Sequence, residues 1–173
     1  MFVASNLSEY AESADAILPP PMEIESLAEE ATLISLAEGG ATINLYFGNL
    51  AGTPLFSVSV FPDRSVVLEE EALMEGELRL WILGYVIANQ ILLRDPRCSV
   101  GVWHGKDGLI YLDVTVTVSS KKKALKLGAQ YNQLAVFDLK RLDSLDTKGD
   151  GSSVANLPPP LERLPPMARD REE

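Results

Sequence analysis

Hydrophobic and polar residues alternate most clearly between residues 98 and 118. Val100 and Val102 precede a polar turn at residues 104–108, and nine residues then alternate strictly from Ile110 to Val118. A period of two is typical of a strand with one buried face, and two such runs joined by a short turn predict a β-hairpin.

The same alternation occurs at residues 42–47 and 56–60, which are separated by a loop at residues 48–54. We expect these two segments to pair as another hairpin. A shorter alternating run at residues 135–139 predicts one further strand.

Apolar residues at helical spacing predict a helix from about Leu73 to Leu93. Residues of both faces are apolar, so this helix is expected to be covered on more than one side. Asp95-Pro96 ends it. The inward face is predicted to hold Leu78, Trp81, Ile82, Tyr85, Ala88 and Leu92.

A second helix is predicted after Ser119 or Ser120, either of which can cap its first turn. Its inward face would carry Ala124, Leu127, Gly128 and Tyr131, and Asn132 suits the left-handed backbone that often ends a helix.

The predicted order is β-β-α-β-β-α-β. It indicates an α+β fold of two layers, with an antiparallel or mixed sheet of about five strands, two helices on one face, and extended N- and C-terminal arms. The predicted domains are an acidic N-terminal arm at residues 1–40, a single α+β core at residues 41–148, and a Gly/Ser-rich and then Pro-rich C-terminal arm at residues 149–173.

Charge and proline content support this division. Residues 1–40 hold eight acids and no Lys or Arg, and eight of the eleven prolines lie at residues 19–21 and 158–166. Segments of this composition bury little apolar surface and are expected to order against a partner.

Composition also excludes several function classes. A net charge of −10 argues against direct nucleic-acid binding, which needs a basic surface. One cysteine and one histidine exclude a disulfide framework and most His- or Cys-based metal sites. The apolar run at residues 78–93 is too short to span a membrane.

No catalytic motif emerges. Cys98 and His104 would lie on one strand, six residues and roughly 20 Å apart, too far for a nucleophile and its base. A phosphate loop at residues 101–107 and a calcium loop at residues 146–151 both lack required residues. No cofactor is expected.

Two groups of residues form a candidate interaction surface. Polar and aromatic side chains on one sheet face make either a solvated face or a recognition patch. The lysines of the second helix are an exposed first turn, a contact for an acidic partner, or a docking place for the acidic N-terminal arm. The residues concerned are Trp103, Tyr111, Asp113, Thr115, Lys121, Lys122 and Lys123.

The segments Tyr111-Leu112-Asp113-Val114 and Asn132-Gln133-Leu134-Ala135-Val136-Phe137-Asp138-Leu139 are the most specific parts of a longer pattern. Over about residues 94–142, the chain resembles small proteins of tailed bacteriophages and related mobile elements. The resemblance implies a setting in a virion or host cytoplasm. It supplies no catalytic residues.

The sequence therefore favours a non-enzymatic phage protein, a virion-associated structural or accessory component that binds neighbouring proteins through its arms. The alternative is an acidic host-takeover or anti-defence inhibitor that occupies a basic site on a host protein. The expected partners are other phage or host proteins, with self-association as a further option, and neither nucleic acid nor membrane.

Overall fold

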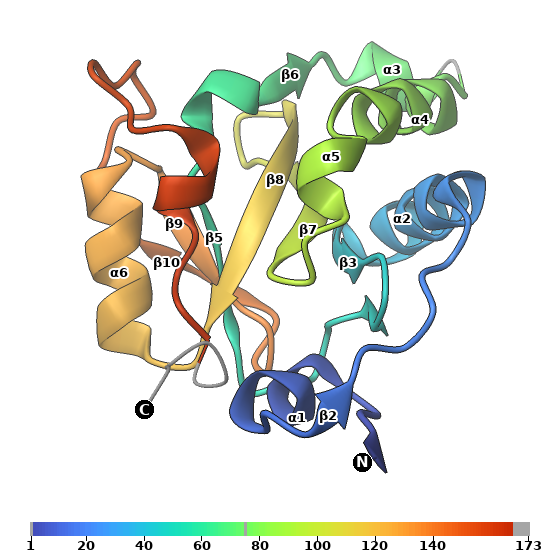
Figure 1. Cartoon of the computed structure of the whole chain (residues 1–173). Coiled ribbons are helices and arrows are strands. Elements are labelled where there is room, and N and C mark those ends of the chain that lie inside the picture. The colour runs from blue at the N-terminus through green and yellow to red at the C-terminus, as the bar shows by residue number, and fades with distance from the viewer. Residues whose placement is uncertain (1, 75, 168–173) are drawn as a thin grey trace.

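A computed structural model describes residues 2–74 and 76–167 of the chain. It shows an α+β fold built on a curled antiparallel sheet, with helices packed against one face (Figure 1). The strands of this sheet follow the order β10-β9-β5-β8-β7-β3-β4, and β6 pairs with β8 beside that path. The prediction of about five strands is therefore corrected to eight.

The hairpin predicted at residues 98–118 is confirmed. It consists of β7 (Cys98–His104) and β8 (Ile110–Val118), paired antiparallel with Val100 opposite Val114. The even-numbered residues Val100, Leu112 and Val114 are fully buried, because this side of the sheet faces the helices.

Two strands share the second edge of β8. β5 (Phe56–Ser59) pairs with its C-terminal half, and β6 (Val66–Leu68) pairs with its N-terminal half. Between them the chain leaves the sheet in the 3-10 helix η1 (Pro62–Arg64). The edge is therefore interrupted opposite Asp113.

The hairpin predicted between residues 42–47 and 56–60 is wrong. β3 (Gly40–Asn44) pairs instead with β7 and with the short β4 (Gly48–Asn49), whereas β5 joins β8 and β9 (Ala135–Asp138). The Asn44 side chain ends β3, because its oxygen accepts from the N–H groups of Tyr46 and Phe47 and its amide donates to the Pro96 and Cys98 carbonyls.

Six α-helices occur among the described residues, not two. The helix predicted at residues 73–93 is three pieces, and the second predicted helix is confirmed as α6, with Ser120 accepting from the Lys123 N–H. The helices are α1 (Leu7–Glu12), α2 (Ile24–Glu38), α3 (Glu71–Met74), α4 (Leu78–Ala88), α5 (Gln90–Leu93) and α6 (Lys121–Gln130).

The N-terminal segment is not an extended arm over its described length. α2 lies beside α4 and packs on β3, burying Leu27, Ala28 and Ala31 completely. The small alanine side chains allow α2 to approach its neighbours closely, and Leu27 joins the main core. Three of its acids, Glu25, Glu29 and Glu38, are exposed, so a high negative charge did not prevent this helix from packing.

The segment before α2 forms a smaller unit at one end of the sheet. β1 (Phe2–Val3) and β2 (Ala16–Ile17) pair in parallel, and α1 between them buries Leu7. Leu7 belongs to a second apolar cluster with Leu50, Leu55, Leu139 and Met167.

The C-terminal segment also returns to the core. After β10 (Asp143–Asp146), the chain reaches the 3-10 helix η2 (Pro160–Arg163), where Arg163 and Leu164 are buried. Figure 1 shows η2 in front of the sheet, next to α6. Residues 168–173 of the predicted C-terminal arm lie outside the described residues.

Within the described ranges, no helix is both long enough and apolar enough to cross a membrane.

Candidate functional site

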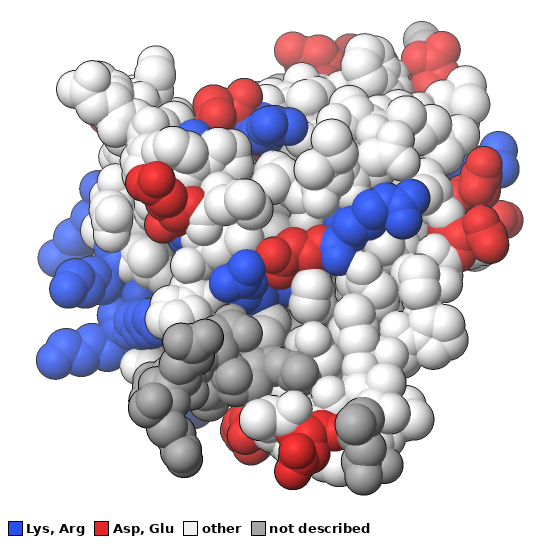
Figure 2. All heavy atoms as spheres, viewed as in Figure 1, with Lys and Arg blue, Asp and Glu red and all other residues white. Residues whose placement is uncertain are grey.

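The outer face of α4 and α5 is apolar and uncovered. Leu80 is 64% exposed, Trp81 48% and Ile91 86%, and Ile87 is also about half exposed. Figure 2 shows a broad uncharged area over these two helices. Single exposed apolar residues are ordinary, but a continuous group of them on one helix marks an interaction surface.

The lack of charge on this face is already visible in the sequence. No charged residue occurs between Leu80 and Leu93, so α5 and the part of α4 after Arg79 carry no charge on any side. The prediction that the helix is covered on more than one side is confirmed, because Val86 and Leu93 are buried and Leu83 packs against the core, but a further side is left open by α2 and the sheet. Trp81, predicted to point inward, lies on this open face.

A groove of about 710 Å³ runs along one side of the apolar face, between α4 and the η1–β6 segment. The Arg64 guanidinium donates to Asn89 Oδ1 at 3.3 Å and joins the two walls of the groove. The groove is lined by Arg64, Val66, Glu77, Leu80, Trp81, Gly84, Tyr85, Ala88, Asn89 and Leu112.

Tyr85 is a buried polar residue of this groove, as is Asn89. Its hydroxyl lies close to the Val114 backbone but makes no well-formed hydrogen bond. Burial raises the pKa of the phenol well above its usual value, and the negative charge of Asp113 adds to this effect. The phenol therefore stays protonated and neutral, and cannot act as a base.

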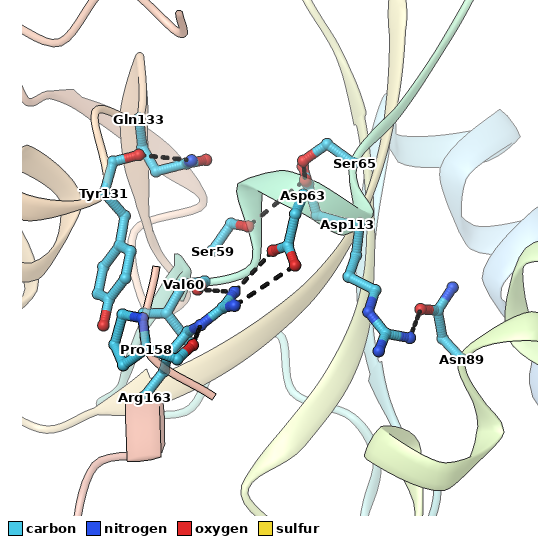
Figure 3. Close-up of polar contacts among 11 residues, drawn as sticks. Ser59, Val60, Asp63, Ser65, Asn89, Asp113, Tyr131, Gln133, Pro158 and Arg163 are labelled. Atoms are coloured by element: carbon cyan, nitrogen blue, oxygen red, sulfur yellow. Dashed lines mark hydrogen bonds and ion pairs between the residues drawn. The ribbon is translucent and has the colours of Figure 1, made fainter. Parts of the chain in front are cut away.

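Asp113 connects the end of β5 with the segment just before β6, across the gap beside β8. Its carboxylate accepts from the hydroxyls of Ser65 and, at 3.5 Å, of Ser59 (Figure 3). Burial raises the pKa of this carboxyl, while the two hydroxyl groups oppose the rise. Asp113 does not line the groove, so the raised pKa is explained by a structural role.

The other sheet residues of the candidate surface share the face of Asp113 but have separate surroundings. Trp103 lies opposite Tyr111 in the β7–β8 pair, with ring centres 5.1 Å apart, and the Tyr111 hydroxyl donates to Asp107. That hydrogen bond is the main cause that raises the pKa of Tyr111 to about 12. Thr115 is buried against the Ser99 carbonyl.

Lys121, Lys122 and Lys123 are exposed on the first turn of α6. Figure 1 places α6 and α2 on opposite sides of the molecule, so α2 does not dock on these lysines. Lys121 borders a second, smaller hollow of about 280 Å³, together with Asp138, Lys140 and Arg141. Lys121 is thus brought together with other basic residues, but not with Trp103 or Tyr111.

Cys98 and His104 lie at opposite ends of β7, opposite Val116 and Ile110 respectively. Burial raises the pKa of the Cys98 thiol to about 12, which removes its nucleophilic form near neutral pH. The described residues contain no group of three or more His, Cys, Asp or Glu side chains arranged to hold a metal ion.

Neither a protein-family model, nor a curated protein, nor a solved structure matches the chain. The resemblance to phage proteins therefore stays a prediction.

Proposed function

We propose that this protein is a non-catalytic component that binds another protein chain through the uncovered face of α4 and α5. The observation that carries the proposal is the exposure of Leu80, Trp81, Ile87 and Ile91 on one helical surface without an intervening charge. Burying such side chains against a partner is favourable by about 25 cal/mol for each Å² of apolar surface.

The surroundings of the titratable residues support a binding role over catalysis. Asp113 is held by serine hydroxyls, the Cys98 thiol is buried, and Tyr85 is kept neutral. A catalytic site needs a nucleophile, acid or base that is both reactive and open to a substrate.

The proposed setting is a phage virion or an infected cell, where the protein would contact neighbouring structural proteins. In this proposal the partner contacts the face of α4 and α5 and not the two terminal segments, because α2 and η2 pack on the core. The alternative, inhibition of a host protein by an acidic surface, would instead use the exposed acids around α3, among them Glu69, Glu70 and Glu71.

The test is site-specific photo-crosslinking in the cells that naturally produce the protein. A benzophenone amino acid at position 91 would report on the proposed face, because Ile91 is the most exposed apolar residue on it. The matched control is the same amino acid at Leu161, a highly exposed apolar position on η2.

We expect a discrete protein adduct from position 91 and none from position 161. Absence of any adduct from position 91 under conditions where the variant is folded and produced would overturn the proposed function. The mass of the adduct separates two cases, since a self-adduct has twice the mass of the chain and a different partner does not.

A further inference from the structure

We propose that the groove beside α4 binds an elongated aliphatic carboxylate, with the carboxylate on Arg64 and the apolar tail along Gly84 and Trp81. This inference goes beyond the proposed function, which concerns a protein partner on the outer face of the helices, and does not depend on it. It follows from the size and direction of the groove, from the charges at its two ends, and from a buried hydroxyl group that lacks a hydrogen-bond partner.

The groove has the size and the shape of a small-molecule site. Its volume of about 710 Å³ lies within the range of about 300–1,000 Å³ that is usual for such sites. It follows one face of α4 from Glu77, just before the helix, to Asn89, just after it. At a rise of about 1.5 Å per residue, this part of the chain is about 18 Å long. An elongated ligand therefore fits the groove better than a compact one.

The lining of the groove is apolar along most of this length. Val66, Leu80 and Leu112 supply aliphatic surface, and Trp81 supplies an aromatic ring. Gly84 leaves the middle of the groove open, because a Cβ atom at this position would meet nothing within 4 Å. Glycine in a helix interior is unfavourable compared with alanine, and space for a ligand gives a reason for it here. An aliphatic tail would cover this apolar surface.

The two ends of the groove carry opposite charges. Arg64 lies at the end near Asn89 and forms no ion pair within the described part of the chain. The carboxylate next to it in the sequence, Asp63, pairs with Arg163 instead. Glu77 lies at the opposite end and repels an anion. A ligand carboxylate is therefore directed to the Arg64 end, where the planar guanidinium can bind both of its oxygens.

Tyr85 supplies a second polar group at the same end. It lies one helical turn before Asn89, whose side-chain amide donates to the Tyr85 carbonyl at 2.9 Å. Burial raises the pKa of the phenol and the charge of Arg64 opposes the rise, so the hydroxyl and the guanidinium lie near each other. The side chain is 6% exposed, and its hydroxyl has no hydrogen-bond partner among the described residues. Buried polar groups are normally paired, and a carboxylate bound at Arg64 would offer this hydroxyl an acceptor.

The experiment measures the binding of decanoate to the full chain by isothermal titration calorimetry, at decanoate concentrations too low for micelles. Decanol has the same tail without the charge, and decylamine has the same tail with the opposite charge. The variants are Arg64→Gln, which removes the cation, and Gly84→Leu, which fills the middle of the groove. The matched control is Arg141→Gln, which removes the same charge from an exposed position outside the groove. Circular dichroism verifies that each variant is folded.

We expect the natural chain to bind decanoate about tenfold more tightly than decanol, because the carboxylate gains charged hydrogen bonds, and to bind decylamine more weakly still. Arg64→Gln should weaken decanoate binding about tenfold and leave decanol binding unchanged. Gly84→Leu should remove the binding of both ligands, and Arg141→Gln should change neither. If Gly84→Leu does not fold, Ala88→Leu fills the same groove from an exposed position.

Absence of decanoate binding to the natural chain would overturn the inference, and so would equal affinities for decanoate and decanol. Equal losses in Arg64→Gln and Arg141→Gln would also overturn it, because attraction by overall charge would then explain the binding. None of these results affects the proposed function, since Ile91 does not line the groove and a crosslink from position 91 reports on a different surface.

Discussion

Arg163 donates from Nη1 to the carboxylate of Asp63 at 2.6 Å, across a separation of 100 residues in the sequence. The arginine is 6% exposed, and its guanidinium also donates to the carbonyls of Pro158 and Val60 (Figure 3). The same guanidinium lies 5.5 Å from the centre of the Phe61 ring. One side chain thus ties the C-terminal segment to the interruption between β5 and β6.

Replacing Arg163 with alanine should destabilise the protein by about 2–4 kcal/mol, because a buried cation network and its packing are lost together. Urea denaturation followed by circular dichroism measures the change. The matched control is Arg141→Ala: Arg141 is 82% exposed and only 4.0 Å from Asp138, so its loss should cost under about 0.5 kcal/mol. Equal effects of the two variants would contradict the anchoring role of Arg163.

Asp63 should make the protein less stable at acidic pH. The hydrogen bond from Arg163 holds the pKa of this carboxyl below its usual value, although burial opposes the effect. Its stabilising contribution is therefore present above the unfolded-state pKa of about 3.9 and is lost as the pH falls through the lower folded-state value. We expect the stability difference between the natural chain and Asp63→Asn to shrink in acid, as measured by melting temperature across pH.

The contribution of Asp113 to stability should change with pH in the opposite direction. Burial raises the pKa of its carboxyl, so the folded state holds the proton more tightly than the unfolded state. Its contribution to stability declines as the pH rises from about 3.9 through the raised folded-state pKa. Asp113→Asn, which keeps an acceptor for Ser65, should therefore gain stability relative to the natural chain as the pH rises toward neutral. A parallel response of the Asp63 and Asp113 variants would refute this assignment.

Two helical glycines should respond oppositely to alanine. A Cβ at Gly128 in α6 would lie 2.6 Å from Thr147 Cγ2 and 2.7 Å from Val136 Cγ1, so Gly128→Ala should cost about 1–3 kcal/mol through overpacking. Gly84→Ala in α4 meets nothing within the chain and should stabilise the monomer by about 0.5–1 kcal/mol through helix propensity. Denaturation at protein concentrations low enough for the chain to be monomeric measures the change in unfolding free energy for each variant.

The Cys98 thiol should report global unfolding. It is fully buried and its pKa is raised to about 12, so a thiol reagent at mildly alkaline pH can react only after the core opens. We expect labelling of the native protein to be slow and to follow the unfolding rate as denaturant is added. Immediate labelling of the native chain would show that β7 is accessible.

Local patterns predicted part of this fold well. The alternation at residues 110–118 gave β8, and the Ser120 cap and Asn132, which has a φ of 51°, gave the start and the end of α6. These features depend on neighbours within a few residues, which is the range over which periodicity and capping act.

Strand pairing and the terminal segments were not predicted, because they depend on distant contacts. Nothing local indicates that β3 pairs with β7 or that Arg163 reaches Asp63. The acidic residues of α2 obscured Leu27, Ala28 and Ala31, whose spacing does place them on one helical face. That spacing was the signal that could have revealed α2.

The candidate site was only partly accessible from sequence. The uncharged run from Leu80 to Leu93 was visible, but whether anything covers its outer face depends on where α2 lies. The polar sheet residues around Asp113 were a candidate interaction surface because of their composition. The structure shows that the Asp113 carboxylate accepts hydrogen bonds from the Ser59 and Ser65 hydroxyls.

The order of strands in the sheet also bears on how fast the chain folds. β3 and β7 are neighbours although more than fifty residues separate them, and the same is true of β5 and β8. Closing such large loops costs chain entropy before any strand contact repays it, and folds rich in distant pairings commonly fold in milliseconds to seconds. Among the described strands, β7 and β8 form the longest pairing between strands joined by a short connection, so we expect this hairpin to form before β3 and β5 add to it.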